Sequence, residues 1–271
     1  MDEITSLQNQ RVKDAAKLRD RRERRKQGRM LIDGAREIRL AIEGRVELIE
    51  AFVCESLCHS SESQRLLEQL VTLPVRQSRV TPAVFEKLAF GDRAEGVLAI
   101  AKTPKRTLND LALPSTPLVA VLEGTEKPGN IGAVLRSADA AGVSAVIVAD
   151  PRTDLFNPNT IRTSLGTVFT MPVCTAAAAD ARDWLLAERI NIFAARVEAE
   201  TLYAAVDFTR PAAIVLGGEA EGLSSTWNGP NVSPVRLPMR GHADSLNVSA
   251  TAAVLFYEAV RQRQCMHHAP S

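Results

Sequence analysis

The sequence predicts an α/β protein made of two domains. Short apolar segments alternate with helix-like segments along most of the 271 residues, which is the pattern of α/β folds. One stretch, TPKRTLNDLALPSTP from Thr103, breaks this alternation with three prolines and little periodicity, as interdomain linkers do. We therefore predict a small α/β domain over residues 1–105, a linker over 106–117 and a larger α/β domain over 118–271.

The first domain is predicted to open with a basic helical region. Residues 11–29 read RVKDAAKLRDRRERRKQGR, with only three acidic side chains among the bases, and Ser6 or Asn9 can cap the helix start. On a chain of net charge +1 this favours a polyanionic partner such as nucleic acid, although a solvated helix face with i,i+4 ion pairs is the alternative. Beyond it we predict strands at 30–33, 48–53, 73–76 and 96–101, and helices at 35–42, 62–70 and 82–88.

The second domain is predicted to contain a parallel sheet. Leu118–Leu122 is continuously apolar, as in strands that are buried on both faces of such a sheet. The strands are expected at 118–122, 143–148, 168–173, 190–195, 213–216 and 234–238, and the helices at 131–141, 157–165, 176–188 and 248–262.

Composition argues against several classes of protein. The four cysteines are scattered and no two pairs have zinc-site spacing, so we expect reduced thiols and no metal. The first ten residues contain no apolar signal core, and no apolar run reaches the about 20 residues of a membrane span, so we expect a cytoplasmic protein. GxGxxG is missing, which argues against a dinucleotide-binding oxidoreductase, and the phosphate-binding motif GxxxxGK[ST] does not occur either.

Candidate chemistry gathers in three loops at strand ends, where open α/β sheets bind ligands. The first loop reads EGTEKPGNIGAVLR, in which Asn130 is expected to cap the following helix while the side chain of Arg136 points back to the helix start. The second reads LGGEAEGLS, where Gly217 and Gly218 allow close approach to the backbone and Glu219 stands at the tip. An ordinary capped helix and an ordinary glycine turn are the structural alternatives.

The third loop runs from Leu237 into the closing helix. Three small polar residues, Ser245, Asn247 and Ser249, crowd a helix start that needs only one cap. The free N–H groups and positive dipole end of a helix suit an anion or the polar edge of a cofactor, so this junction is a candidate binding site.

Together the three loops resemble the signature motifs of the SpoU/TrmH branch of the SPOUT RNA methyltransferases. EGTEKPGNIGAVLRSADAAG, LGGEAEGLS and LPMRGHADSLNVSATAAV carry the resemblance, which spans 118–263, and the N-terminal half is similar to the substrate-binding domain that often precedes this one. The resemblance implies a deep trefoil knot, bound S-adenosylmethionine, a homodimer formed through the knot domain, and methyl transfer to a ribose 2′-hydroxyl of RNA.

The resemblance also implies roles for individual residues. The cofactor is expected to contact the backbone of Gly217, Leu237 and Leu246, with Met239 at the adenine and Gly218 and Gly241 beside them. Arg136 matches an arginine that helps to remove the hydroxyl proton. Because arginine is a poor base, an alternative role is to anchor an RNA phosphate. The matching polar residues around it are Asn130, Glu219, Ser245 and Asn247.

Two questions stay open at this point. Ribosomal RNA is favoured as the substrate because a separate N-terminal domain adds a second contact surface, but transfer RNA is an alternative, as is a non-catalytic RNA-binding protein that retains the fold. The loop from Arg240 to Asp244 departs from the small uncharged residues usual in the third motif, which leaves its contribution to substrate contacts open.

Overall fold

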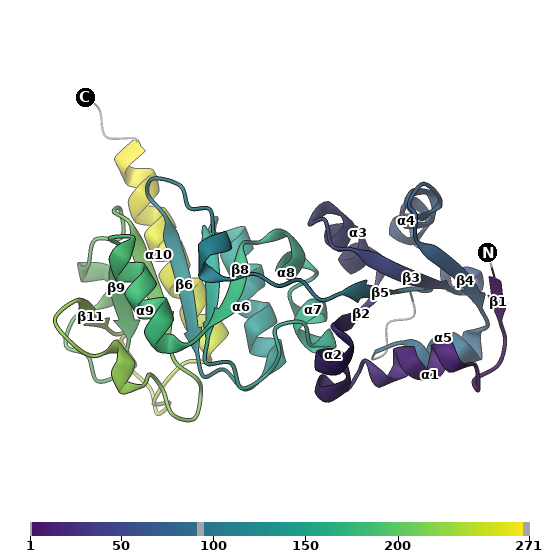
Figure 1. The fold of residues 1–271 in the computed structure, drawn as a ribbon. Coiled ribbons are helices and arrows are strands. Elements are labelled where there is room, and N and C mark those ends of the chain that lie inside the picture. The colour runs from purple at the N-terminus through teal and green to yellow at the C-terminus, as the bar shows by residue number, and fades with distance from the viewer. Residues whose placement is uncertain (1, 91–94, 268–271) are drawn as a thin grey trace. The chain divides into compact units, whose positions relative to one another are not determined.

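The computed structural model describes residues 2–90 and 95–267, with side chains as far as Cys265. The chain forms two compact units (Figure 1): unit 1 contains the residues up to Pro104 together with Phe156–Thr170, and unit 2 contains Lys105–Leu155 and the residues from Met171 onward. Residues 156–170, which the sequence analysis counts with the second domain, thus pack within unit 1. The linker packs within unit 2, where Leu111 is buried against the sheet.

Unit 1 is built on a mixed five-stranded sheet. Its strand order is β1–β4–β3–β5–β2; β4 is parallel to both of its neighbours, and β5 is antiparallel to both of its own. The strands are β1 (Asp2–Ile4), β2 (Arg29–Asp33), β3 (Leu48–Val53), β4 (Arg76–Val80) and β5 (Val97–Lys102).

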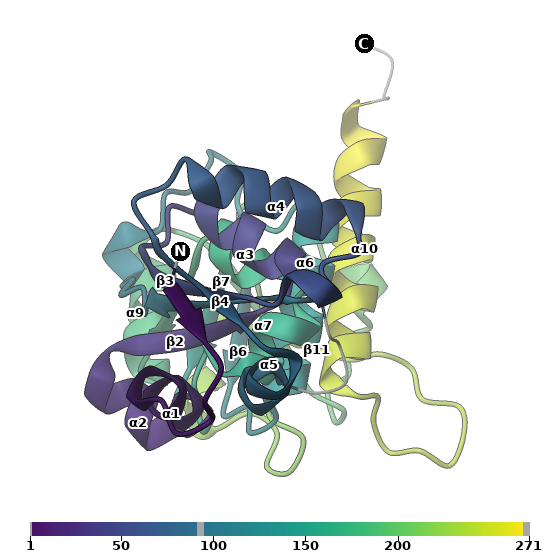
Figure 2. The same cartoon turned by 90° about the vertical axis from the view of Figure 1, so that its right-hand side faces the viewer.

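Helices cover both faces of this sheet, with α1 and α5 on one face and α3 and α4 on the other (Figure 2). Leu31, Phe52 and Leu98 point to the α1 and α5 side, and the alternate strand residues are buried on the opposite side, as the two-residue period of a strand requires. The helices of unit 1 are α1 (Gln10–Lys17), α2 (Arg21–Gln27), α3 (Ala35–Glu43), α4 (Ser61–Val71), α5 (Pro82–Leu88), α7 (Pro158–Thr163) and α8 (Thr167–Thr170).

The predicted basic helical region is confirmed as helix, but it is two helices. Asn9 caps α1 and Asp20 caps α2, each side-chain oxygen accepting a backbone N–H, and Gly28 ends α2 in the left-handed conformation. The new cap at Asp20 divides the basic residues, so that α2, with the sequence RRERRKQ, carries half of them.

Two strand predictions in unit 1 were wrong. The strand expected at 73–76 lies at Arg76–Val80 because Pro74 cannot donate to a strand ladder and the polar sequence RQSRV gives only a weak apolar signal. The edge strand β1 was missed, since its three residues are too few to show a period.

Unit 2 is built on a six-stranded sheet that is parallel throughout, as predicted. Its order is β11–β9–β10–β6–β7–β8. The strands are β6 (Leu118–Glu123), β7 (Ala145–Ala149), β8 (Val173–Ala176), β9 (Asn191–Ala195), β10 (Ala212–Leu216) and β11 (Val232–Val235).

The faces of this sheet are covered by α9 on one side and by α6 and α10, which pack together, on the other (Figure 1). Val119, Val121 and Ile147 meet Ala181 and Leu185 of α9 in one apolar core. The helices of unit 2 are α6 (Pro128–Ala140), α9 (Ala178–Ala187) and α10 (Val248–His267).

Residues 168–173 are not the strand that was predicted. Val168 and Phe169 belong to the short helix α8 and are buried there, and the strand β8 begins at Val173. Both residue types favour strands, so tertiary packing has overridden a local preference.

Chain order reverses between β6 and β10, which are neighbours in the sheet. From β6 the chain proceeds through β7 to β8, then crosses to β9 on the other side and returns to β10. Ligands bind at such switch points in open α/β sheets, outside the carboxyl ends of the strands. The first two loops singled out in the sequence follow β6 and β10 and therefore meet here.

A buried carboxylate joins these two loops. Glu123, at the end of β6, is 5% exposed and accepts hydrogen bonds from the Ser224 backbone N–H at 2.8 Å and from its hydroxyl at 2.6 Å.

None of the described helices is long and apolar enough to cross a membrane. The trefoil knot stays a prediction from the resemblance.

We expect Glu123→Ala to destabilise unit 2, because the change leaves the Ser224 N–H without its acceptor. The expected loss in free energy of unfolding is about 1–3 kcal/mol. Both tryptophans of the sequence, Trp184 and Trp227, lie in unit 2, so urea denaturation followed by tryptophan fluorescence reports on this unit. Glu200→Ala, at an exposed carboxylate, is the control; equal stability of both variants would contradict the assigned role.

Candidate active site

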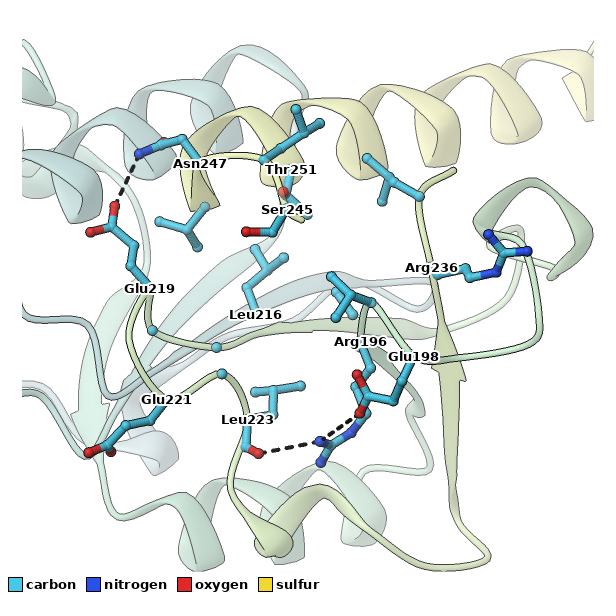
Figure 3. Close-up of a pocket in the computed structure, with 18 of the residues that line it drawn as sticks. Arg196, Glu198, Leu216, Glu219, Glu221, Leu223, Arg236, Ser245, Asn247 and Thr251 are labelled. Carbon is cyan, nitrogen blue, oxygen red and sulfur yellow. Dashed lines mark hydrogen bonds and ion pairs between the residues drawn. The ribbon is translucent and has the colours of Figure 1, made fainter. Parts of the chain in front are cut away.

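A cavity of about 630 Å³ opens in unit 2 at the carboxyl ends of β9, β10 and β11 (Figure 3). The segment after β10, the segment after β11 and the first turns of α10 enclose most of it. This volume is within the about 300–1,000 Å³ of pockets that bind small molecules and cofactors. The residues that line it are Lys127, Ala195, Arg196, Val197, Glu198, Leu216, Gly217, Gly218, Glu219, Glu221, Gly222, Leu223, Val235, Arg236, Leu237, Met239, Ser245, Leu246, Asn247, Val248 and Thr251.

One side of the cavity is made of closely packed backbone. A Cβ atom on Gly217 would lie 2.3 Å from the carbonyl carbon of Gly222, and one on Gly218 would lie 2.9 Å from the carbonyl oxygen of Gly124. The chain turns back within this loop: the Gly222 N–H donates to the Gly218 carbonyl at 3.0 Å, with Gly222 at a φ of +65°. Side chains are therefore excluded here, and a ligand in the cavity can reach backbone atoms directly.

The segment after β11 supplies the opposite side. Leu237, Met239, Ser245 and Leu246 all line the cavity, and Leu246 is 43% exposed. Gly241 is absent from the described residues that line it, and a Cβ atom there would meet nothing within 4 Å. The structure thus brings Gly217, Gly218, Leu237, Met239 and Leu246 together and leaves Gly241 apart.

Three of the five residues predicted to be catalytic form one hydrogen-bonded cluster at the edge of the cavity. The Glu219 carboxylate accepts from the side-chain amide of Asn130. It also accepts from that of Asn247 at 3.1 Å, the contact drawn in Figure 3. The Asn247 amide also lies 3.5 Å from the Asn130 carbonyl oxygen. These residues are separated by 89 and 28 positions in the sequence and come from α6, the loop after β10 and the start of α10.

A lysine completes this cluster. The Nζ atom of Lys127 lies 2.5 Å from a Glu219 carboxylate oxygen. This bond to Lys127 lowers the pKa of Glu219, and the Asn130 amide adds to the effect, while the pKa of Lys127 is raised by the same contact. Glu219 therefore stays ionised at neutral pH, where it acts as a hydrogen-bond acceptor and is a weak base.

Two helix starts next to the cluster differ in their capping. Asn130 was predicted to cap α6, and this was wrong: Pro128 is the first helical residue, Lys127 precedes it, and Asn130 lies in the first turn with its amide turned to Glu219. Asn247 does cap α10, because its carbonyl oxygen accepts the Ser249 N–H at 2.9 Å. The capping role of Asn247 leaves its amide nitrogen free to bind Glu219, which explains part of the surplus of polar residues at this junction.

Arg136 lies elsewhere on α6. Its side chain is exposed two turns into the helix, and it is not among the described residues that line the cavity. Ser245 does line the cavity, beside Asn247. Sequence reasoning therefore found the cavity, but the arginine at its predicted catalytic edge is separate from it in this structure.

Two residues of the site were missed from the sequence. Lys127 was passed over within the first motif, although a lysine directly before a helix-opening proline and near a loop glutamate was a usable signal. Arg196, at the end of β9, donates to the Leu223 carbonyl at 3.3 Å and to the Ser224 carbonyl at 3.0 Å, which fixes the loop after β10. Nothing local in the sequence marks that contact. In the described part of the chain, no group of three or more His, Cys, Asp or Glu side chains is placed to hold a metal ion.

Known proteins resemble the chain over nearly its whole length. The model of the SpoU rRNA Methylase family matches residues 117–257, and that of the MRM3-like substrate binding domain matches residues 9–99. A 23S rRNA (uridine(2479)-2'-O)-methyltransferase of Streptomyces viridochromogenes is 31% identical over 258 residues, covering 92% of this chain and 88% of the relative.

Two solved structures agree with this similarity. A crystal structure described as an RNA 2'-O ribose methyltransferase is 42% identical, with a TM-score of 0.84, and covers 97% of this chain and 99% of its own. The SpoU methyltransferase AviRb from Streptomyces viridochromogenes, in complex with AdoMet, is 29% identical, with a TM-score of 0.86, and covers 95% and 99%. With the three motifs gathered around one cavity and the family model matching more than half of the sequence, the chain belongs to the SpoU rRNA methylase family.

Proposed function

We propose that this protein transfers a methyl group from S-adenosylmethionine to a ribose 2′-hydroxyl of ribosomal RNA. The observation that carries the proposal is the Asn130–Glu219–Asn247 cluster at the edge of a backbone-lined cavity, in a chain of the SpoU family. The related Streptomyces enzyme is named for a 2′-O-methylation of 23S ribosomal RNA, and AviRb was solved with AdoMet bound.

The cavity has the properties that this cofactor requires. Backbone groups of the loop after β10 and of the segment after β11 can bind the polar edges of the adenine and ribose, while Met239 and Leu246 supply apolar contacts for the ring. S-adenosylmethionine brings a methyl group already activated on a sulfonium. The protein therefore mainly has to hold that group and the hydroxyl in line.

The polar cluster has a positioning role in this proposal. A ribose hydroxyl is a poor nucleophile until its proton leaves, but Glu219 has a lowered pKa and is already held by Lys127, Asn130 and Asn247. We assign these residues, with Ser245, to orienting the ribose. Arg136 is assigned to the RNA side of the reaction, where its guanidinium can bind a phosphate with two parallel hydrogen bonds.

The substrate is assigned from the first part of the chain. Residues 9–99 match a substrate-binding domain model, and α2 exposes its basic side chains except Arg24, which is buried. Two RNA-binding surfaces can contact a structured ribosomal RNA element over a greater length than a single domain can. This favours ribosomal RNA as the substrate. We therefore assign residues 1–105 to substrate binding and residues 118–271 to catalysis.

The proposed active form is a homodimer. On α10 the buried residues Leu255 and Phe256 face the protein, whereas Val254 is 37% exposed and Tyr257 is 53% exposed on another face. Exposed apolar residues next to a packed helix pair suit a second copy of the same surface in a two-fold dimer.

Gly217→Ala is expected to weaken S-adenosylmethionine binding. The added methyl group would meet the Gly222 backbone at 2.3 Å, so the loop must move away from the cofactor. We expect the dissociation constant, measured by calorimetry, to rise at least about tenfold, or about 1.4 kcal/mol.

Gly241→Ala is the matched comparison, because its Cβ atom meets nothing within 4 Å. Unchanged cofactor binding in this variant would remove Gly241 from the cofactor contacts, whereas unchanged binding in Gly217→Ala would contradict the backbone-lined site. Tryptophan fluorescence distinguishes a local change from loss of the fold.

The activity itself is tested with a 23S ribosomal RNA transcript and S-adenosylmethionine labelled in its methyl group, followed by mapping of 2′-O-methylated positions. We expect label at one or a few positions, and more label than on 16S or transfer RNA transcripts.

Arg136→Lys is expected to lower kcat/KM by about tenfold or more, the size of a lost charged hydrogen bond. Lysine keeps the positive charge but cannot donate two parallel hydrogen bonds to one phosphate.

Arg210→Lys, at an exposed arginine outside the cavity lining, serves as control. Full turnover by Arg136→Lys would rule out a role for Arg136 that needs the two parallel hydrogen bonds of its guanidinium. Absence of methyl transfer to any of the three RNA classes, with cofactor binding intact, would overturn the proposed function.

The dimer is tested by sedimentation velocity. Tyr257→Glu places a charge on the exposed face of α10 and is expected to shift the protein from dimer to monomer. Val71→Glu, at an apolar residue that is 75% exposed on α4 of unit 1, should leave the dimer intact. A monomeric native protein, or a dimer that tolerates the charge at Tyr257, would disprove this interface.

A further inference from the structure

A second cavity adjoins the first in unit 2, and the proposed reaction leaves it unused. It has a volume of about 270 Å³ and lies at the carboxyl ends of β6, β7 and β10. Its lining shares five residues with the cofactor cavity, all from the start of α6 and the loop after β10. The complete lining is Gly124, Thr125, Glu126, Lys127, Asn130, Arg152, Gly218, Glu219, Ala220, Glu221 and Gly222.

We propose that this cavity binds the ribose and phosphate of the acceptor nucleotide, with Arg152 as the phosphate-binding residue and the Thr125 hydroxyl as a further hydrogen-bonding group. The proposal rests on the proposed function, because it names where the RNA substrate of that reaction lies. It adds Thr125, which lies in the first motif but had no assigned role, and Arg152, which lies after β7 and outside the three motifs; neither lines the first cavity.

The position of the cavity suits an acceptor. Asn130 and Glu219 line it, and Glu219 also lines the cofactor cavity, so the polar cluster stands between the two spaces. A hydroxyl held at the Glu219 edge of this cavity would lie next to the cofactor cavity, because the two linings share that residue. The volume is below the about 300–1,000 Å³ of pockets for drug-sized ligands and suits one sugar-phosphate unit.

Thr125 gives independent evidence for a ligand. Its side chain is 2% exposed, and among the described residues its hydroxyl oxygen has no hydrogen-bond partner. Buried hydroxyl groups in native proteins are nearly always paired. An unpaired one on a residue that lines a cavity, two positions after the end of β6, points to a partner supplied by the substrate.

Arg152 is held in place by contacts that a phosphate can replace. Its guanidinium pairs with Glu126 at 2.6 Å and also with Glu221, and all three side chains are about half exposed or more. Exposed ion pairs of this kind contribute little net stability. An RNA phosphate offers two oxygens in the geometry that the guanidinium prefers, so it can take the place of one carboxylate.

The neighbouring charges favour a phosphate at Arg152 over one deeper in the cavity. Three carboxylates line this space, of which Glu219 is paired with Lys127 and the other two with Arg152. Next to this lining α6 begins at Pro128, and its first turn presents the positive end of a 13-residue helix. Of the two cations that line the cavity, Lys127 is held by Glu219, so the phosphate is assigned to Arg152, and the carboxylates can accept hydrogen bonds from the sugar hydroxyls.

The test measures the affinity of the full-length protein for a 23S ribosomal RNA transcript as a function of salt, together with methyl transfer and S-adenosylmethionine binding. In Arg152→Gln we expect RNA affinity to fall about tenfold, and the slope of log Kd against log salt to fall by about 0.7–0.9, the value of one lost phosphate contact. Cofactor affinity should stay within twofold of the native protein. Arg210→Gln, an exposed ion-paired arginine outside both cavities, should leave the salt slope unchanged.

Thr125→Val separates substrate binding from folding. Valine has nearly the same shape and removes a hydroxyl without a partner, so the free energy of unfolding should stay equal or rise, while kcat/KM for RNA falls several-fold. An unchanged salt slope in Arg152→Gln, or a Thr125→Val variant with native kcat/KM, would overturn the proposal. So would weaker cofactor binding in either variant, since the cavity would then belong to the cofactor. The proposed function is tested separately: it fails if the native protein transfers no methyl group. The outcomes for the two variants are therefore interpreted only when the native protein is active.

Discussion

The close contact of backbone with backbone in the loop after β10 is the constraint on which the candidate active site depends. Gly217 and Gly222 approach so closely that no side chain fits between them. Glu123 from β6 and Arg196 from β9 hold the far end of the same loop through Ser224 and Leu223. Because two neighbouring strands fix it, the loop can form one wall shared by two cavities and expose main-chain atoms at its glycines.

Glu219 connects this loop to the helices. Its carboxylate binds Lys127 and Asn130 at the start of α6 and Asn247 at the start of α10, so three separate segments meet at one side chain. The contacts with Lys127 and Asn130 lower its pKa, which makes the residue an organising anion and a poor base. The chemistry at this edge is therefore one of positioning, in keeping with a methyl donor that is already activated.

Much of the fold was predictable because periodicity survives in the sequence. The parallel sheet of unit 2 followed from continuously apolar strands, and the core helices followed from their apolar faces. The errors fell where periodicity is short or overruled: the three-residue strand β1, the polar strand β4, and residues 168–170, which are helical although their side chains favour strands. Each of these depends on partners that are distant in the sequence.

The sequence by itself determined the family, through three motifs whose residue types suffice to identify it, and it determined which loops carry polar and glycine residues. Only the tertiary structure decided how those residues are used. It turned Asn130 from a helix cap into a partner of Glu219, added Lys127 to the cluster, and left Arg136 exposed outside the cavity. It also placed Thr125 and Arg152 around a second cavity. The physical reason is that parallel strands bring their carboxyl ends to one edge of the sheet, so contacts there join loops that the chain order keeps far apart.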